Sequence, residues 1–189
     1  MSKKGMAMIL IICMSIWAPG LVWGQKGDVI QEAKQGVVEI YSGLITDDGV
    51  FHQMNQGSGF VIYNEEDSAY VVTTRRTAVS SEKERKAYCK KNEIATDNFS
   101  LQEAIRVVVK GDVTVEAALL TESAEQNYAV LQVDGSISER LPLKLAAAKM
   151  LVTGDTVYAL GFADGAGTDD TRVGTEFSAM DVEIREGTV

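Results

Sequence analysis

The sequence predicts an all-β fold. Past residue 25 the chain breaks into short segments rich in valine, isoleucine and tyrosine, and glycine, aspartate and asparagine separate these segments. Several segments alternate apolar with polar residues, which is the pattern of a strand buried on one side. A chain of 189 residues that is 46% hydrophobic is long and apolar enough for about one domain with a buried core.

The N-terminus has the pattern of a signal peptide. Lys3 and Lys4 precede the uncharged apolar run Met6–Trp17. Val22 and Gly24 lie three and one residues before Gln25, and small residues at those places suit a signal peptidase. We therefore expect residues 1–24 to be removed and the mature chain to start near Gln25.

An uncleaved membrane anchor is the alternative to cleavage, because Gly5–Gly24 is about long enough to cross a bilayer as a helix. Pro19 and Gly20 interrupt that run, since proline lacks the backbone donor and glycine favours non-helical angles. The apolar helix should end there and be short for spanning. The predicted location is secreted, periplasmic or otherwise extracytoplasmic, with no membrane contact after cleavage.

Eight segments are candidate strands. The acidic and amide residues Asn64–Asp67 fall between two of them and predict a hairpin tip. The candidates are Gly36–Ser42, Ser58–Tyr63, Tyr70–Thr74, Ile105–Lys110, Thr114–Leu119, Tyr128–Val133, Thr156–Phe162 and Val173–Ile184.

One helix is predicted over Ser81–Lys91, because Ser81 and Glu84 have the spacing of a capping box. No cofactor and no metal ion is predicted. The carboxylates at Glu65–Asp67 lack the spaced oxygen ligands and the glycine of a calcium loop, so they indicate a solvated turn.

Charge and cysteine content limit the partners. The net charge of −9 becomes −11 when Lys3 and Lys4 leave with the signal peptide, and this excess repels the phosphates of nucleic acid. Of the two cysteines, Cys13 lies in the signal peptide, so the mature chain keeps only Cys89. Cys89 cannot close an internal disulfide; it is either free or paired between chains, and we favour the free thiol.

Several short motifs resemble the trypsin-like serine peptidases of the bacterial HtrA/Deg type, in the order and spacing of that family over about Val37–Ala179. They are Gly57-Ser58-Gly59-Phe60-Val61-Ile62, Ala69-Tyr70-Val71-Val72-Thr73-Thr74, Ala129-Val130-Leu131-Gln132-Val133, Leu141-Pro142-Leu143 and Gly154-Asp155-Thr156-Val157-Tyr158-Ala159-Leu160-Gly161. The resemblance implies two antiparallel β-barrels with a cleft between them.

The resemblance also locates the catalytic positions, and this chain departs from the family at each of them. Thr77 stands where the family has its histidine base, and a hydroxyl cannot hold a proton near neutral pH. Asn127 stands where the family has the orienting aspartate, and an amide has no charge to stabilise an imidazolium. The family's nucleophile lies in Gly-x-Ser-Gly-Gly, and the chain reaches Val189 without that motif, so we expect neither the serine nor its oxyanion hole.

No other constellation replaces the triad. His52 is the only histidine and is predicted to lie in a loop. Ser58 matches a strand entry, not a nucleophile elbow, and no motif joins Cys89 to His52. The neighbouring arginines, Arg75 and Arg76, would lie near the cleft; we favour a solvated turn over pairing with a carboxylate.

The predicted organisation is a signal peptide at 1–24, an N-terminal lead-in at 25–36, a complete first barrel at 37–135 and a partial second barrel at 136–189. We expect a pseudoprotease that binds a peptide or protein. The alternatives are a truncated relic and a serine endopeptidase that needs a complementing chain. Because an incomplete barrel leaves strand edges exposed, a homodimer or a strand added by a partner is also expected.

Overall fold

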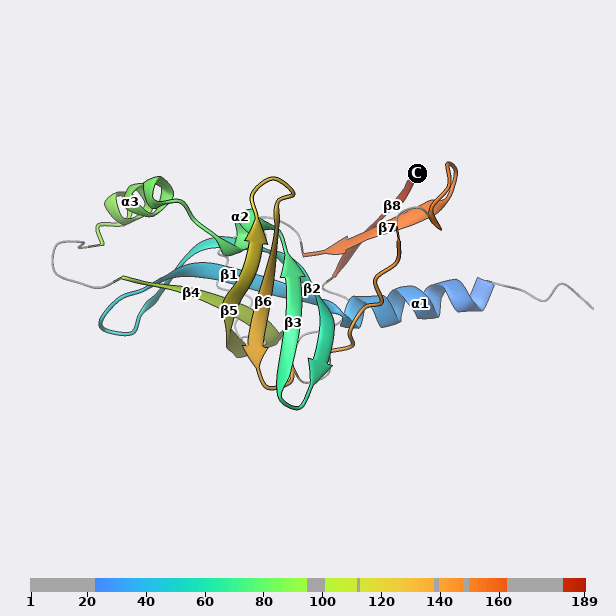
Figure 1. The fold of residues 1–189 in the computed structure, drawn as a ribbon, viewed down its shortest axis with the longest axis horizontal. Helices are drawn as coiled ribbons and strands as arrows, with labels where there is room; N and C mark the ends of the chain where they lie inside the picture. Colours follow the sequence, from blue (N-terminus) through green and yellow to red (C-terminus); the bar gives the residue numbers. More distant parts are fainter. Residues whose placement is uncertain (1–22, 95–100, 112, 138–139, 148–149, 163–181) are drawn as a thin grey trace, which may run out of the picture.

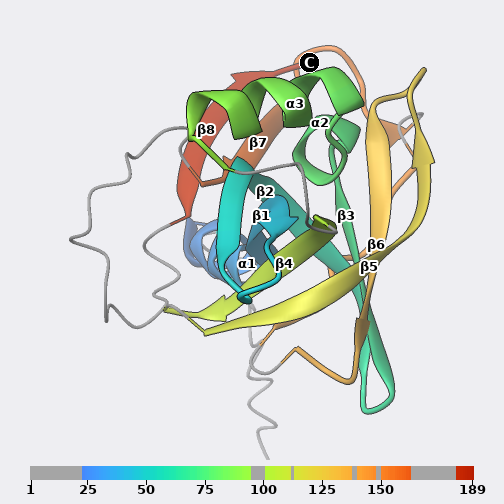
Figure 2. The same cartoon turned by 90° about the vertical axis from the view of Figure 1, so that its left-hand side faces the viewer.

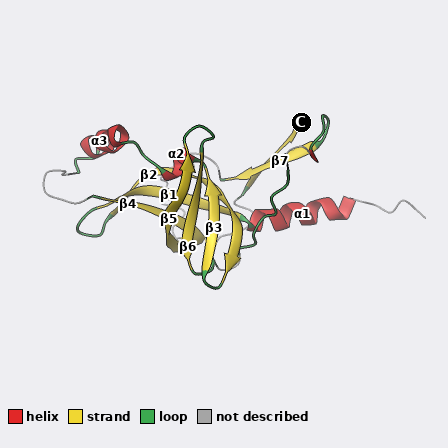
Figure 3. Ribbon diagram, viewed as in Figure 1, coloured by secondary structure: helices red, strands yellow, loops and turns green. Residues whose placement is uncertain are grey.

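The fold is built mainly from β-strands that enclose one barrel (Figures 1 and 3). The computed structural model describes residues 23–94, 101–111, 113–137, 140–147, 150–162 and 182–189. Its elements, in chain order, are α1 (Trp23–Gln35), β1 (Val37–Ile45), β2 (Phe51–Glu65), β3 (Ser68–Thr73), α2 (Arg75–Ala78), α3 (Glu82–Lys91), β4 (Gln102–Lys110), β5 (Val113–Ser123), β6 (Tyr128–Asp134), β7 (Thr156–Gly161) and β8 (Glu183–Thr188).

Six strands close the barrel in the order β1-β2-β3-β6-β5-β4, and every neighbouring pair is antiparallel. The β2–β3 hairpin turns at Glu66 and Asp67, as predicted from its acidic and amide residues. Closure removes free strand edges, so each barrel strand has partners on both sides. Figure 2 looks toward the end of the barrel on which α2 and α3 lie.

The core of the barrel consists of aliphatic side chains that alternate along the strands. In β6, Ala129, Leu131 and Val133 are buried while the residues between them are half-buried. The same period of two places Val71 of β3 and Val107 of β4 in this core with no exposed surface. One-sided burial was the basis of the strand predictions, and it holds for these strands.

The last two described strands form a separate antiparallel sheet, β7–β8, beside the barrel and above α1 (Figure 1). The chain reaches it through a segment in which the Leu143 N–H donates to the Val61 carbonyl of β2 at 2.8 Å. Every residue of β8 is exposed. The predicted strand Val173–Ile184 falls mostly outside the described residues; the structure describes Val182, Glu183 and Ile184 of it, and the last two begin β8.

Helix α3 confirms the predicted helix. Ser81 is its N-cap; the Ser81 hydroxyl accepts from the Glu84 N–H, and the Glu84 carboxylate accepts from the Ser81 N–H. Both partners of the capping box are therefore satisfied. Helix α1 was not predicted. No helix in the described ranges combines the length and apolar character needed to cross a membrane.

The prediction that His52 lies in a loop is wrong, because β2 begins at Phe51 and His52 pairs with Leu44 of β1. The stretch from Phe51 to Gln56 contains histidine, asparagine and two glutamines, which are poor indicators of a strand. Cross-strand pairing with β1 extends the strand through these polar residues.

Candidate functional site

Thr77 lies on the short helix α2, directly after β3. The hydroxyl of Thr74 caps this helix by accepting from the Thr77 N–H, and the two threonine hydroxyls lie 2.9 Å apart. Thr77 is only 7% exposed, and a Cβ on Gly57 of β2 would overlap its side chain. The hydroxyl at the predicted base position is thus enclosed and hydrogen-bonded to Thr74, the N-cap of its helix.

Asn127 lies beside the same helix because of the pairing between β3 and β6. Thr73 pairs with Ala129, so continuing this antiparallel register by two residues places Arg75 opposite Asn127. The Arg75 N–H donates to the Asn127 carbonyl at 3.3 Å, and the Arg76 N–H donates to Asn127 Oδ1 at 3.4 Å. The structure therefore brings the two predicted triad positions, Thr77 and Asn127, to one helix.

Asn127 has a backbone φ of 51°, in the left-handed region. Asparagine tolerates this conformation better than most residues with a side chain. The side chain is exposed and neutral, and its oxygen is used by the backbone of α2. In this arrangement Asn127 anchors a helix start and supplies no negative charge to the site.

A second set of polar side chains holds the segment after α2 to the barrel. The Ser42 hydroxyl of β1 donates to the Thr77 carbonyl at 2.6 Å. The Asn55 amide of β2 donates to the hydroxyls of Ser42 and Ser80, at 3.0 and 2.8 Å. These bonds hold the end of α2 against β1 and β2. Sequence reasoning missed the three residues that make them and so position the site, which are Ser42, Asn55 and Ser80. Their types are ordinary in strands and loops, and no motif marks them.

The space between the barrel and the β7–β8 sheet forms a pocket of about 430 Å³, which we call the inter-sheet pocket. Ser58 of β2 lies on its barrel side, and its hydroxyl accepts from the Phe162 N–H at 2.7 Å. Glu183 and Arg185 line it from β8 and form an ion pair at 3.6 Å. The other lining residues are Ala159, Leu160, Gly161 and Phe162.

Among the described residues, Ser58 shares the inter-sheet pocket with one basic side chain, Arg185, which is a permanent cation and cannot accept a proton. Its hydroxyl hydrogen-bonds to a backbone amide, and the chain's single histidine, His52, lies six residues away on the same strand, about 20 Å along an extended strand. The His52 Nε2 instead lies 3.4 Å from the Thr46 hydroxyl. Proton abstraction from Ser58 by His52 is therefore excluded by distance.

The remaining candidates are separated from the inter-sheet pocket. Cys89 is a free thiol on α3, 2% exposed, and it does not line that pocket. Arg75 pairs with Glu122 of β5 at 2.5 Å, so a carboxylate of this chain engages it, and the favoured interpretation of a solvated turn is wrong for Arg75. Arg76 is exposed at the surface. Within the described ranges, no three His, Cys, Asp or Glu side chains are grouped to hold a metal ion.

Comparison with known families identifies one match. The sequence model of the family described as trypsin-like peptidase domain matches residues 57–189. The matched range begins at Gly57 on β2 and includes α2, Asn127 and both strands of the second sheet. Comparison with curated protein sequences gives no match.

Proposed function

Because this chain belongs to the family of trypsin-like peptidase domains, with an all-β fold of one closed barrel and a partial second one, we propose that it is an exported, catalytically inactive member that binds a peptide or protein segment. The order of its motifs favours the HtrA/Deg type within that family. The proposal has three parts, which are inactivity, peptide binding and export.

The environment of Thr77 supports the first part of the proposal, catalytic inactivity. A general base must accept a proton near neutral pH, and a threonine hydroxyl has no lone pair basic enough for that. The Thr77 hydroxyl is already engaged with Thr74, and the Asn127 oxygen is engaged with the Arg76 amide. Neither side chain can therefore take the role that the family's histidine and aspartate perform.

The second part is supported by the β7–β8 sheet. Within the part of the chain that the structure describes, β7 and β8 pair only with each other. A strand with unpaired backbone groups accepts an extended peptide by β-strand addition. The inter-sheet pocket runs along β8 and would take a side chain of that peptide beside Ser58.

Export is supported by the two lysines and the apolar run before Gln25. Helix α1 begins at Trp23, so cleavage at Gln25 would leave most of that helix on the mature protein. Mass spectrometry of the protein recovered outside the cytoplasm of an expressing bacterium should give a chain that starts at Gln25. A product that keeps Met1 and stays in the membrane fraction would instead identify an uncleaved anchor.

Inactivity is tested with the purified full chain. Casein cleavage and labelling by a fluorophosphonate, which reacts with activated serines, should both stay at the level of the blank. The single changes Thr77→His and Asn127→Asp should give no activity either, because each restores one role only. An active trypsin-like peptidase serves as the positive control for both assays.

The alternative, a serine endopeptidase completed by another chain, makes an opposite prediction. Activity would then appear when extracts of the native host are added, and it would copurify with this chain. Casein cleavage that coelutes with the protein and is blocked by the fluorophosphonate would overturn the proposed inactivity.

Peptide binding is tested by NMR with valine- and threonine-rich peptides of about six residues, a usual strand length. The expected result is a shift of the β8 backbone amides, with basic peptides binding more tightly than acidic ones because the chain carries a net charge of −9. The matched control is the same peptide with alternate N-methylated residues, which cannot complete the ladder. Equal binding of both peptides would rule out strand addition.

A further inference from the structure

A second pocket is lined by residues of the barrel strands together with Ala78 of α2 and Arg85 of α3. These two helices lie at one end of the barrel (Figure 2). We call this second pocket the barrel-end pocket, and its volume is about 210 Å³. It does not share a residue with the inter-sheet pocket. The residues that line it are Ser42, Gly43, Leu44, Met54, Ala78, Val79, Ser80, Arg85, Glu103, Ala104, Ile105, Ala117, Ala118 and Leu119.

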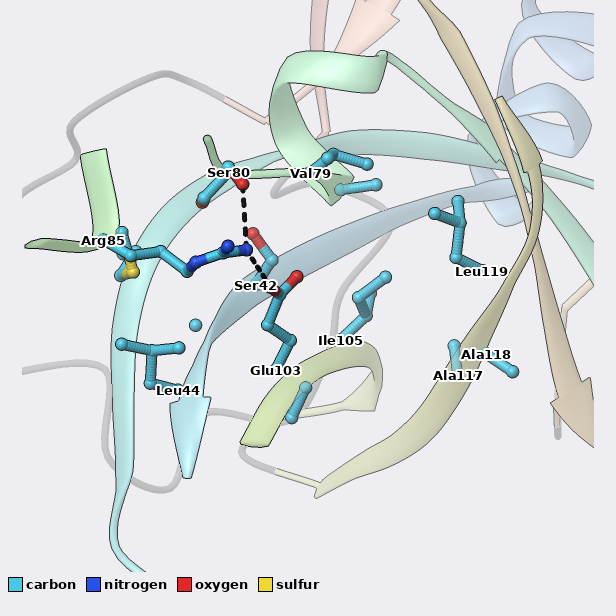
Figure 4. A pocket seen from close by; sticks show the side chains of 14 residues that line it. Ser42, Leu44, Val79, Ser80, Arg85, Glu103, Ile105, Ala117, Ala118 and Leu119 are labelled. Atoms are coloured by element: carbon cyan, nitrogen blue, oxygen red, sulfur yellow. Dashed lines mark hydrogen bonds and ion pairs between the residues drawn. The ribbon is translucent and has the colours of Figure 1, made fainter. Parts of the chain in front are cut away.

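Small side chains create this hollow. Ala104 of β4, Ala117 of β5 and Ala78 of α2 line the pocket, and their methyl groups leave more space than longer aliphatic side chains would. Around them lie the side chains of Leu44, Ile105 and Leu119 (Figure 4). The walls are therefore mainly aliphatic, and they are held by strands that pair on both sides.

The polar groups of the pocket are already hydrogen-bonded, either to one another or to neighbouring residues. The Ser42 hydroxyl donates to the Thr77 carbonyl and accepts from Asn55, which also donates to the Ser80 hydroxyl. Because these groups are already hydrogen-bonded, the pocket walls have few free donors and acceptors for a polar ligand. A polar molecule entering the hollow would lose its hydration without full replacement, which is unfavourable.

Helix α3 extends a charged side chain across the mouth. Arg85 Nη1 donates to the Ser80 carbonyl at 3.2 Å and forms an ion pair with Glu103 of β4 (Figure 4). Each charge of this pair is neutralised by the other. The pair therefore gives no net electrostatic attraction to a charged ligand. The aliphatic parts of the Arg85 and Glu103 side chains narrow the entrance of the pocket.

We propose that the barrel-end pocket binds a small, uncharged, apolar molecule of the size of a one- or two-ring aromatic compound. The volume supports this size, since an apolar protein cavity of about 150 Å³ is known to stay dry and to bind benzene. Met54 adds an adaptable wall that suits aromatic rings. This site is separate from the proposed peptide site and does not depend on the absence of catalysis.

The experiment uses the full chain and indole as the probe, followed by methyl-detected NMR. Indole should shift the methyl signals of Leu44, Ile105 and Leu119 in a saturable manner and leave those of β7 and β8 unchanged. Methyl signals that do not shift, or shifts that rise linearly without saturation, would overturn the proposal. Because this measurement uses the unmodified protein, it does not depend on any variant folding.

Two leucine substitutions then test which of the two pockets binds indole. Ala117→Leu fills the barrel-end pocket and should weaken indole binding by about tenfold. Ala159→Leu adds the same group beside the inter-sheet pocket and should leave the affinity unchanged. If Ala159→Leu weakens binding and Ala117→Leu does not, indole occupies the inter-sheet pocket and the proposal fails.

Discussion

The hydroxyl of Ser58 on β2 accepts a hydrogen bond from the backbone N–H of Phe162, 104 residues later, at 2.7 Å. This bond joins the barrel to the end of β7. Gly161 beside it leaves room, since a Cβ there would lie 3.0 Å from the Ser58 oxygen. Ser58 is therefore a link between the barrel and the β7–β8 sheet.

Replacing Ser58 with alanine should loosen the β7–β8 sheet. Losing the bond from the Phe162 N–H to the Ser58 hydroxyl costs about 1 kcal/mol. Hydrogen exchange should show faster exchange at Phe162 while the amides of β3 and β6 stay protected. Ser68→Ala at the start of β3 is the matched control. Unchanged exchange at Phe162 would mean that other contacts hold the sheet.

Gly57 and Thr77 should show strong energetic coupling. A methyl group at Gly57 would overlap the Thr77 side chain, with Thr77 Cγ2 only 2.9 Å from it. Gly57→Ala should therefore lower the free energy of unfolding by about 1–3 kcal/mol, as overpacking does. Adding Thr77→Ala should recover part of this loss, which urea denaturation measures as a double-mutant cycle.

The matched control for this cycle is Gly27→Ala on α1, where nothing lies within 4 Å of the added methyl group. That change should be neutral or slightly stabilising, because alanine favours a helix over glycine. If Gly57→Ala and Thr77→Ala lower stability by independent, additive amounts, the two side chains do not compete for this space.

Asn127 should be more sensitive to alanine than to aspartate. Its positive φ and its oxygen acceptor both favour a short amide or carboxylate side chain. Asn127→Ala should cost about 1–2 kcal/mol of unfolding free energy, from backbone strain and from the lost hydrogen bond with the Arg76 N–H. Asn127→Asp should be nearly neutral, since it keeps the acceptor. Equal losses for both variants, measured by urea denaturation, would contradict the role of the Oδ1 bond.

The sequence predicted most strands because one-sided burial leaves a period of two, as in β6. It could not predict β2 before Gly57, since His52 and its polar neighbours are held in the strand by pairing with β1. Helix α1 was missed for a related reason. This helix contains Gly24, Gly27 and few apolar side chains, so neither helix propensity nor hydrophobic periodicity predicts it.

Within the candidate site, the resemblance located Thr77 and Asn127 but not their contacts. The Asn127–Arg76 bond depends on the β3–β6 register, which involves residues far apart in sequence. The bonds of Ser42 and Asn55 likewise depend on barrel closure. Local sequence patterns do not predict such long-range pairing. The Ser81–Glu84 capping box, in contrast, is local and was predicted.

The capping box should make the start of α3 sensitive to acid. The pKa of Glu84 is lowered, first because the Ser81 hydroxyl and then because the Ser81 N–H hydrogen-bond to the carboxylate. A carboxyl group whose pKa is lower in the folded state stabilises that state above its ordinary pKa of 4.5 and loses this effect as the pH falls through the folded pKa. Helix α3 should therefore fray at its N-terminus below about pH 4.5, and NMR carbon shifts of residues 82–85 would report it. Glu84→Gln keeps an acceptor but does not titrate, so fraying at the same pH in that variant would show that another group is responsible.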